Sequence, residues 1–500
     1  MRPVKYIISC CAALSLLVAG CGKTEHADSS NSMAEITNVS APEKYGVANV
    51  EMVNGVPTPT SSKKIFDAMD YYGAVQAYLW AMPAMGLKGW ENANVDMGAD
   101  STLDGQISLY HGYDGAAGIL TPNTRVTYLI SFVDTKVHGP AVWIIPAGKS
   151  AGAVSDQWQR PISDTGVTGP DRGKGVKLLV VGPDQDVPKH DGSYTVLRSP
   201  TRVVWLATRN MADPGPGHDN LTDMFDVYPY ERPDLAGREK LRKKGDAFKQ
   251  RQPHGMEFWT NLNEIVQREK MAERDVFFYA ILRNLGIEKG KPFNPSKEQI
   301  ELLVEAERVG YLMAINNGFK KRFEGARYYT GKKWYVALVN SPGQMQDTHG
   351  EMFERASWFH EAIGSSYAMK MSGPGPGSTY LGQYEDAQGH GFDGGNNYKL
   401  EVPADVPAGQ FWALTVYDSL DRTLVRNDQR SAELNSLNEL VQNKDGTTTL
   451  YVGPAAPKGM ESNWIQTKGG LNWFAYFRLY NPEAAYFDKS WVLNDFEKVE

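Results

Sequence analysis

His360 and Glu361 are the two adjacent side chains that come closest to a known catalytic motif. A zinc protease helix carries a second histidine one turn after the first, so that both imidazoles face the same metal ion. Gly364 stands at that position, and a site of that type is therefore excluded. With His349, the two residues remain candidates for acid–base catalysis, because imidazole and carboxylate groups are common proton carriers in enzymes. The alternative is that all three have ordinary structural roles.

Acidic side chains are crowded in a glycine-rich loop that contains Asp386 and Asp393, together with His390 and Asn396. Closely spaced oxygen ligands on a flexible backbone suit a divalent metal such as calcium, so Asp386 and Asp393 are candidate ligands. The spacing is not that of an EF-hand. Asp-Gly turns explain the same residues without a metal, since aspartate stabilises turns by accepting backbone hydrogen bonds.

Four aromatic or imidazole side chains are candidates for contact with a small molecule or a glycan. His111 and Tyr113 lie in a glycine-rich passage, and such loops can form the rim of a binding site. Trp412 and Trp464 lie in strand-like segments near the C-terminus. Aromatic faces bind sugar rings and apolar groups well, but alternation along a strand turns about half of them into the core.

The sequence contains no pattern that marks an activated nucleophile. The Gly-x-Ser-x-Gly motif of serine hydrolases is absent. His111, His218 and His254 could meet a serine or tyrosine in space, but their spacing along the chain does not show it. Whether the protein is an enzyme is therefore left open.

The N-terminus predicts export and lipidation. Arg2 and Lys5 precede an apolar run from Ile7 to Val18, and small residues follow it, as in a secretory signal. Ala19-Gly20-Cys21 resembles a bacterial lipobox, which implies that residues 1–20 are a signal peptide and that Cys21 carries the lipid. Gly22, rather than aspartate, follows the cysteine. In enteric bacteria this implies sorting to the outer membrane, so an envelope lipoprotein that faces the periplasm or the cell surface is expected. The other cysteines, Cys10 and Cys11, leave with the signal.

Length and charge limit the classes of protein. Five hundred residues exceed one ordinary core, so two or three domains are expected. The formal net charge is −7, and the basic run from Arg238 to Lys244 is interrupted by an acidic residue, so nucleic acid is not an expected partner. The membrane is the expected partner through Cys21, and a homo-oligomer is left open.

The pattern along the chain predicts a fold that is mainly β with a helical insert. Residues 21–62 are polar and are expected to form a flexible tether. Residues 63–210 are expected to form an N-terminal β domain whose leading helix covers Ile65 to Met82 and ends at Pro83. Residues 211–372 are expected to form a helical subdomain, and residues 373–500 a C-terminal β-sandwich. The strands expected in the N-terminal domain are 126–133, 141–145, 177–181, 194–197 and 203–207. The helices expected in the subdomain are 234–251, 256–284, 296–316 and 351–371.

Several motifs resemble the paired bacterial domains of unknown function numbered 1254 (N-terminal) and 1214 (C-terminal). The C-terminal motifs are Asp393-Gly394, Phe411-Trp412, Thr415-Val416-Tyr417-Asp418, Asn463-Trp464-Ile465-Gln466-Thr467 and Arg478-Leu479-Tyr480. The N-terminal ones are Pro122-Asn123, Tyr128, Gly182-Pro183 and Ser199-Pro200-Thr201-Arg202. The resemblance implies a small Ig-like N-terminal sandwich, a helical subdomain and a C-terminal jelly-roll-like sandwich, and it implies no chemistry. Relatives often carry an aspartate where this chain has Arg125, so a site that used that acid would be altered here.

These observations predict a membrane-anchored envelope lipoprotein that binds a small molecule, a glycan or a partner protein. The alternative is a hydrolase or lyase with a histidine and acid site, with or without a metal, in an interdomain cleft.

Overall fold

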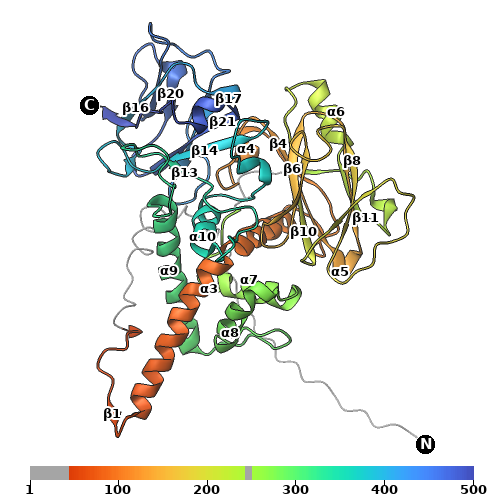
Figure 1. Ribbon diagram of the computed structural model, residues 1–500, viewed down its shortest axis with the longest axis vertical. Coiled ribbons are helices and arrows are strands. Elements are labelled where there is room, and N and C mark those ends of the chain that lie inside the picture. Colours follow the sequence, from red (N-terminus) through yellow and green to blue (C-terminus); the bar gives the residue numbers. More distant parts are fainter. Residues whose placement is uncertain (1–43, 243–249, 500) are drawn as a thin grey trace, which may run out of the picture.

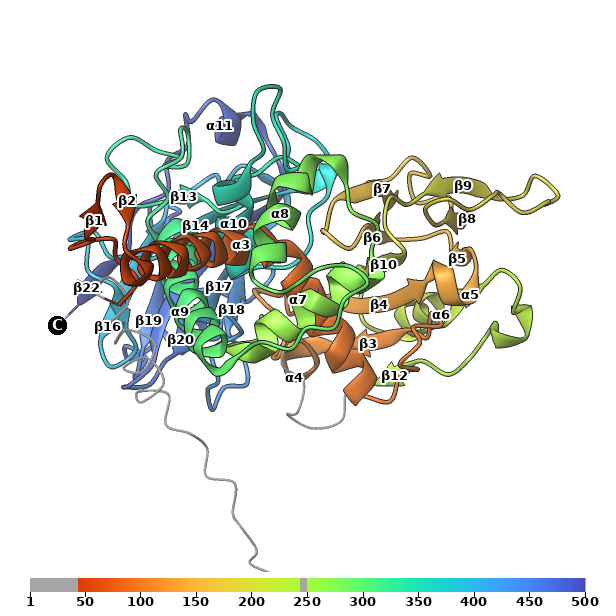
Figure 2. The ribbon, with the colours of Figure 1, turned by 90° about the horizontal axis from the view of Figure 1, so that it is seen from below.

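The computed structural model describes residues 44–242 and 250–499. The predicted signal peptide 1–20, the predicted lipidation at Cys21 and most of the predicted tether 21–62 lie outside the described residues. Two β units lie side by side, and a layer of helices lies along one end of both (Figures 1 and 2). The predicted fold class, mainly β with helical parts, is confirmed.

The N-terminal β unit consists of a six-stranded sheet, in the order β12-β3-β4-β10-β6-β7, and a four-stranded sheet, in the order β11-β5-β8-β9. Leu129, Val133 and Leu206 of the larger sheet pack against Trp143 and Val180 of the smaller one. The strands are β3 (Ser108–Tyr110), β4 (Thr127–Asp134), β5 (Ala141–Ile145), β6 (Ser150–Ser155), β7 (Pro161–Gly166), β8 (Val176–Val181), β9 (Thr195–Arg198), β10 (Val203–Asn210), β11 (Asp226–Pro229) and β12 (Leu241–Arg242). The five predicted strands are confirmed. The unit continues to Arg242, beyond the predicted boundary at residue 210, because β11 pairs with β5 and β12 pairs with β3.

The C-terminal β unit repeats this plan. One sheet has the order β13-β14-β21-β17-β18, with β15 paired to β21, and the other has the order β20-β19-β16-β22. The strands are β13 (Tyr335–Val336), β14 (Ser378–Gln383), β15 (Phe392–Asp393), β16 (Asn397–Val402), β17 (Ala408–Asp418), β18 (Glu433–Asn435), β19 (Thr448–Gly453), β20 (Trp464–Gln466), β21 (Asn472–Pro482) and β22 (Glu497–Val499). β17 and β21 pair along almost their whole length and form the centre of the larger sheet.

The longest helix, α3 (Pro59–Asp96), joins the helical layer to both β units. Thr58 caps its first turn by accepting the N–H of Ser61. The prediction that the helix ends at Pro83 is wrong, because Pro83 lies inside it. Proline removes one helical hydrogen bond, but this turn is fully buried and Gln159 Nε2 donates to the carbonyl of Pro83 at 2.6 Å. Tertiary packing therefore outweighs the local cost of the proline.

The other helices are α4 (Gly112–Ala116), α5 (Thr135–His138), α6 (Pro216–Met224), α7 (Met256–Arg268), α8 (Val276–Asn284), α9 (Lys297–Phe319), α10 (Met352–Glu361) and α11 (Ala484–Phe487). Ser296 caps α9, since its hydroxyl oxygen accepts the N–H of Gln299 at the start of the helix. The predicted helix 256–284 is interrupted at Glu269, whose carboxylate accepts the backbone N–H groups of Arg202 and Val203.

The predicted helix 234–251 is wrong over its described part. That part contains the end of a 3₁₀ turn at Pro233–Leu235, followed by Gly237 with φ +72° and then by β12. A left-handed glycine ends helical geometry, so the chain turns there and adds a strand to the larger sheet. The predicted helix 351–371 is shorter than expected and ends at Glu361. No helix within the described ranges is long and apolar enough to cross a bilayer.

Candidate ligand-binding site

A cavity of about 120 Å³ lies between the two β units. One wall is a face of the larger N-terminal sheet, and the other is formed by β14 and β21 of the C-terminal unit. The lining from the first sheet is Tyr128, Ile130, Ala151, Gly152, Ala153, Trp205, Ala207, Thr208 and Arg209, and that from the second is Tyr380, Arg478 and Tyr480. Trp90 of α3, residues 119–123, Trp358 and residues 362–366 complete it, with Thr168 and Met369.

Strand alternation explains how one sheet supplies both a core and a cavity wall. Successive side chains point to opposite faces. Leu129 and Val133 of β4 therefore pack between the two sheets, whereas Tyr128 and Ile130 face the cavity. In β10 the same rule places Trp205, Ala207 and Arg209 on the cavity side.

Arg478 is the cation on the C-terminal wall. Its guanidinium donates from Nη1 to Thr415 Oγ1 at 2.8 Å and from Nη2 to the carbonyl of Thr121 at 2.9 Å. It also lies about 5.5 Å from the ring centre of Tyr380 and 5.4 Å from that of Tyr476. These contacts hold Arg478 in one orientation, with 3% of its surface exposed.

Glu433 lies behind Arg478 and partly balances its charge. The Thr415 hydroxyl donates to Glu433 Oε2 at 3.0 Å while it accepts from Arg478. Burial raises the pKa of Glu433, although Arg478 opposes the shift. Glu433 does not line the cavity.

Arg209 is the cation on the N-terminal wall. It is half-buried, and no salt bridge to its side chain occurs within the described parts of the chain. Burial acts to lower the pKa of Arg209, but the phenol groups of Tyr380, Tyr128 and Tyr480 outweigh this effect. The pKa of Arg209 is therefore raised above its ordinary value. Burial raises the pKa of Asp164, and the positive charge of Arg209 opposes that shift. The Asp164 oxygens already accept the N–H groups of Tyr367 and Ala368.

Asn123 connects the two walls. Its side-chain amide donates to Tyr480 Oη, and its backbone N–H donates to Tyr128 Oη at 2.8 Å. Arg125 follows this turn but does not line the cavity. Its guanidinium lies 5.7 Å from the ring centre of Phe411 and donates to Asn435 Oδ1 at 3.3 Å. The positive charge at position 125 is therefore directed to the C-terminal sheet beside the cavity.

The other end of the cavity is apolar. Trp90 and Trp205 lie with ring centres 5.8 Å apart, and Ile130 and Trp358 complete this part of the lining. Trp205 is buried, yet its Nε1–H has no hydrogen-bond partner among the described residues. A bound molecule that carries an acceptor can satisfy this donor.

The structure brings His360 and Glu361 together in the core and leaves His349 apart on an exposed loop. Glu361 Oε2 accepts from the hydroxyls of Tyr384 and Tyr476, at 2.5 and 2.6 Å. His360 is fully buried, and burial holds its pKa well below the usual value. None of the three lines the cavity, and their roles in catalysis stay predictions.

The side chains predicted to contact a ligand make hydrogen bonds or ring contacts within the protein. Tyr113 Oη donates to the carbonyl of Val425 at 2.7 Å, and Trp464 Nε1 donates to that of Gly453 at 2.9 Å. Trp412 stacks on Phe477, with ring centres 5.3 Å apart. These three side chains and His111 lie outside the lining of the cavity.

His111 and His218 do meet a hydroxyl group, which is that of Thr127. His111 Nδ1 lies 2.6 Å and His218 Nε2 lies 2.9 Å from Thr127 Oγ1, while His218 Nδ1 lies 3.3 Å from Asp219 Oδ1. The carboxylate assigns the proton to His218 Nδ1, so Nε2 accepts from Thr127 and Thr127 accepts from His111. His254 is not part of this chain of contacts, and its Nδ1 lies 3.1 Å from Glu307 Oε1.

The candidate metal ligands cap turns. Asp386 Oδ1 accepts the N–H groups of Gln388 and His390, and Asp393 Oδ1 accepts that of Gly395. Across residues 44–242 and 250–499, no group of three or more histidine, cysteine, aspartate or glutamate side chains is arranged to hold a metal ion. Calcium binding by Asp386 and Asp393 stays a prediction.

Arg209, Arg478 and Trp205 were not among the predicted site residues. Two signals were present in the sequence. Arg478 and Tyr480 belong to a motif that carries the family resemblance, and Arg478 interrupts a run of aromatic and apolar residues in β21. An arginine within such a strand must have partners or a cavity, because burial of an unpaired charge is costly.

Comparison with known proteins supports the predicted family pair. Residues 107–229 match DUF1254 and residues 377–484 match DUF1214, each described as a protein of unknown function. The predicted order of the two families is confirmed. No protein with curated annotation is significantly similar in sequence.

Two solved structures are similar to this chain. The VPA0106 protein from Vibrio parahaemolyticus has a TM-score of 0.53 at 16% identity, over 86% of this chain and 100% of that chain. An uncharacterized protein from Burkholderia cenocepacia has a TM-score of 0.39 at 12% identity, over 94% of this chain and 97% of that chain. The likeness to the Vibrio protein shows a shared fold alone.

Proposed function

We propose that this protein is an envelope lipoprotein that binds a small organic anion in the cavity between its two β units. The observation that carries the proposal is the positive charge of the cavity lining. The guanidinium groups of Arg209 and Arg478 come from opposite walls, and the described lining contains no carboxylate. Arginine recognises carboxylate and phosphate groups through paired N–H donors, so an anion is the expected partner.

The apolar part of the cavity lining limits what the uncharged part of the ligand can be. Trp90, Trp205 and Trp358 offer flat apolar surfaces, and the free Nε1–H of Trp205 offers one donor. A cavity of about 150 Å³ in another protein holds one benzene molecule. The ligand is therefore an anion whose body is about one ring, or a short aliphatic chain, with an acceptor near the indole of Trp205.

Calorimetry on the whole chain tests this proposal. Benzoate, phenyl phosphate and hexanoate serve as anionic probes, and benzamide serves as the neutral match for benzoate. We expect at least one anion to bind and the amide to bind at least tenfold more weakly. Arg209→Gln should weaken the anion at least tenfold, because it removes the charge from the N-terminal wall.

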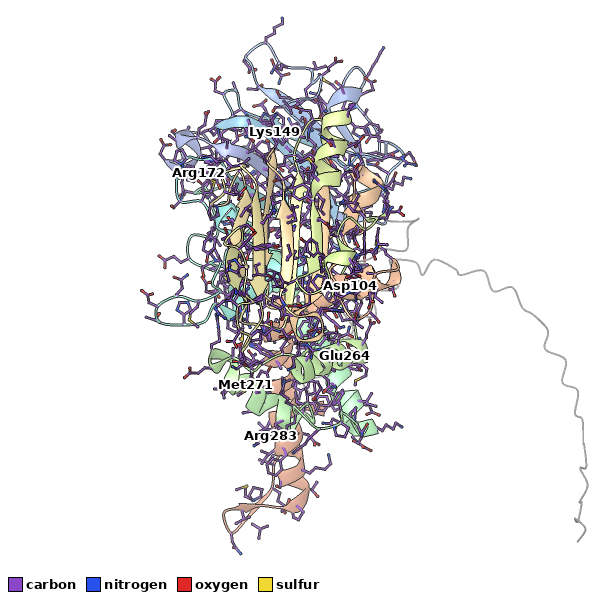
Figure 3. The ribbon with its side chains drawn as sticks, turned by 90° about the vertical axis from the view of Figure 1, so that its right-hand side faces the viewer. Asp104, Lys149, Arg172, Glu264, Met271 and Arg283 are labelled. Atoms are coloured by element: carbon purple, nitrogen blue, oxygen red, sulfur yellow. The ribbon has the colours of Figure 1, made fainter. Side chains whose placement is uncertain are left out.

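Arg283→Gln is the matched control, since Arg283 is exposed at the end of α8, below the β strands in the view of Figure 3, and does not line the cavity. It should leave the affinity unchanged. The proposal fails if no anion of these classes binds, or if Arg209→Gln and Arg283→Gln have the same effect.

The location of the protein is part of the proposal. The lipobox-like residues Ala19-Gly20-Cys21 support export, lipidation at Cys21 and attachment to the outer membrane. A lipid anchor would keep the binding cavity in the envelope, where it could take up a ligand from the surroundings of the membrane. Several acyl chains hold a protein at a membrane far more firmly than one chain does.

A second candidate function is acid–base catalysis at Thr127, and the chain of contacts from His111 to Asp219 favours it. Asp219 orients His218, and His218 accepts the proton of the Thr127 hydroxyl, as a base does beside a nucleophile. Panels of carboxyl esters, phosphate esters and glycosides should then show turnover that His218→Asn abolishes and Arg209→Gln retains. Absence of turnover in every panel would exclude these reactions.

A further inference from the structure

Exposed apolar side chains gather at one end of the molecule. Within the described ranges, twelve large apolar side chains are at least half exposed, and eight of them belong to three neighbouring elements. These elements are the hairpin of β1 (Met52–Val53) and β2 (Val56–Pro57), the first part of α3, and α8. We name this set the apolar end: Met52, Val53, Val56, Phe66, Met69, Tyr72, Val276 and Phe277, each between 50 and 68% exposed.

The first part of α3 is apolar on two sides. Ala68, Tyr71 and Ala74 are buried, whereas Phe66, Met69 and Tyr72 repeat every third residue and remain exposed. A helix of a soluble domain normally buries its apolar stripe and presents polar residues elsewhere. The exposed stripe of α3 is therefore a surface that has no covering element within the described chain.

The apolar end projects from the body of the protein. Figure 1 shows β1 at the tip of α3, and in Figure 3 the helix continues well past Arg283. α8 lies beside the next part of α3, because a Cβ at Gly73 would lie 2.9 Å from Ile281 Cγ2 and Phe278 stacks on Trp80. Val276 and Phe277 are exposed at the start of α8, which lies nearer the body than the stripe of α3 because Trp80 Nε1 donates to Asp275 Oδ1 at 2.8 Å.

The chain leading from the predicted anchor reaches this same end. Tyr45 stacks on Tyr71 with ring centres 4.6 Å apart, and Lys44 pairs with Glu301 at 3.1 Å. Cys21 precedes Lys44 by 23 residues (44 − 21). A segment of that length spans at most about 80 Å. A lipid on Cys21 would therefore hold the apolar end, rather than the two β units, close to the bilayer.

The charges near the apolar end do not select for anionic lipid. Lys63 pairs with Asp67 at 2.5 Å, and Lys64 donates to the carbonyl of Ala48. Paired charges add little attraction to a negative surface. Contact with a bilayer would come from the apolar side chains entering the boundary between head groups and acyl chains.

We propose that the apolar end docks on the lipid surface and directs the cavity away from it. This inference rests on the proposed lipid anchor at Cys21. The occupant of the surface is a bilayer of zwitterionic lipid, and the docked side chains belong to the hairpin, the stripe of α3 and the start of α8.

Fluorescence of the whole acylated chain on phosphatidylcholine vesicles tests the proposal. Cysteines occur only at positions 10, 11 and 21, so Met69→Cys introduces the one free thiol of the acylated, processed chain. An environment-sensitive dye there should shift to the blue on vesicles, and nitroxide-labelled lipid should quench it at least threefold. The matched control is Val137→Cys, an exposed apolar position on α5. Its dye should show neither effect.

Replacement of Phe66 and Phe277 by serine in the Met69→Cys chain should reduce the quenching several-fold. The same two replacements in the Val137→Cys chain should leave the signal of its dye unchanged. If the chain binds vesicles but the dye at position 69 is quenched no more than that at position 137, docking fails while the anchor stands. If the chain does not bind vesicles, the anchor fails too. A blue shift without vesicles, with dimers in sedimentation, would assign the surface to a second copy and overturn the proposal.

Discussion

Lys321 Nζ and Glu361 Oε1 lie 2.5 Å apart, and neither side chain has any exposed surface. The second oxygen of Glu361 accepts from Tyr384 and Tyr476 of the C-terminal β unit. Lys321 follows α9, and Glu361 ends α10. Burial lowers the pKa of Lys321, and the carboxylate of Glu361 opposes that shift. One buried ion pair thus joins two helices to the sheet that forms a wall of the cavity.

Glu361→Gln should lower the free energy of unfolding by about 3–5 kcal/mol, because it leaves the ammonium group of Lys321 buried without its partner. Urea denaturation followed by circular dichroism measures this change. Adding Lys321→Met to Glu361→Gln should recover part of the loss, since the unpaired charge is then removed. A loss below 1 kcal/mol in Glu361→Gln would show that the pair does not hold the helices together.

Glu91 predicts a specific pH dependence. It accepts two hydrogen bonds from Arg268, both at 2.9 Å, and one from Lys88 at 2.6 Å. Burial acts to raise the pKa of Glu91, but Arg268 and Lys88 lower it to below its ordinary value of 4.5. The stability that Glu91 contributes is therefore complete above about pH 4.5 and is lost as the pH falls through the folded-state pKa.

Glu91→Gln should accordingly cost about 3 kcal/mol at pH 7, and the difference from the parent protein should shrink between pH 5 and pH 3. Urea unfolding at a series of pH values checks this. Glu257→Gln is the control, since Glu257 is exposed in the first turn of α7. A difference that stays constant down to pH 3 would contradict the proposed role of the two cations.

Filling the cavity should abolish binding without unfolding the protein. Ala207 lies on β10 and lines the cavity, so Ala207→Phe places a ring in the space that the ligand would occupy. We expect affinity for the anionic probe to fall at least tenfold, with a stability change within about 1–3 kcal/mol. Ala236→Phe, at an exposed loop position, is the control for an added aromatic surface. Equal affinities in the two variants would place the ligand elsewhere.

Gly152 is required by the close pairing of β6 and β10. A Cβ at this position would lie 2.2 Å from the carbonyl oxygen of Ala207 and 2.6 Å from Thr208 Cα. Both are backbone atoms in the middle of a sheet, so Gly152→Ala should cost about 3 kcal/mol or more in urea unfolding. Gly343→Ala is the control, because no heavy atom lies within 4 Å of its added Cβ. A neutral Gly152→Ala variant would refute this register of the two strands.

The predicted lipidation has a direct chemical test. A bacterial host fed an alkyne-bearing fatty acid should transfer the label to the parent chain and to Cys11→Ser, but not to Cys21→Ser. Mass spectrometry of the N-terminal peptide should place the lipid on Cys21 after removal of residues 1–20. A labelled Cys21→Ser chain would disprove the assignment and, with it, the anchor on which bilayer docking depends.

Local patterns determined much of the fold. Alternating apolar residues identify β4 and β10, and Ser296 with Gln299 marks the start of α9. The residues from Phe411 to Asp418 and from Arg478 to Tyr480 indicate the C-terminal family, and the comparison with family models confirms that prediction. These features are readable because they depend on neighbours within a few residues of each other. The expected end of the first helix at Pro83 was wrong because packing around that turn overrides the local rule.

The cavity could not be predicted in the same way. Alternation shows which residues of each strand lie on the same face as Arg209 or Arg478. It does not show which face of one sheet packs against which face of the other. The meeting of these two faces depends on how two separate sheets pack against α3 and against each other, and no periodicity in the chain encodes that contact. The sequence by itself determined the elements, the family pair and the predicted lipid site. Only the tertiary structure brought two distant arginines into one cavity, because their encounter is a product of packing between units.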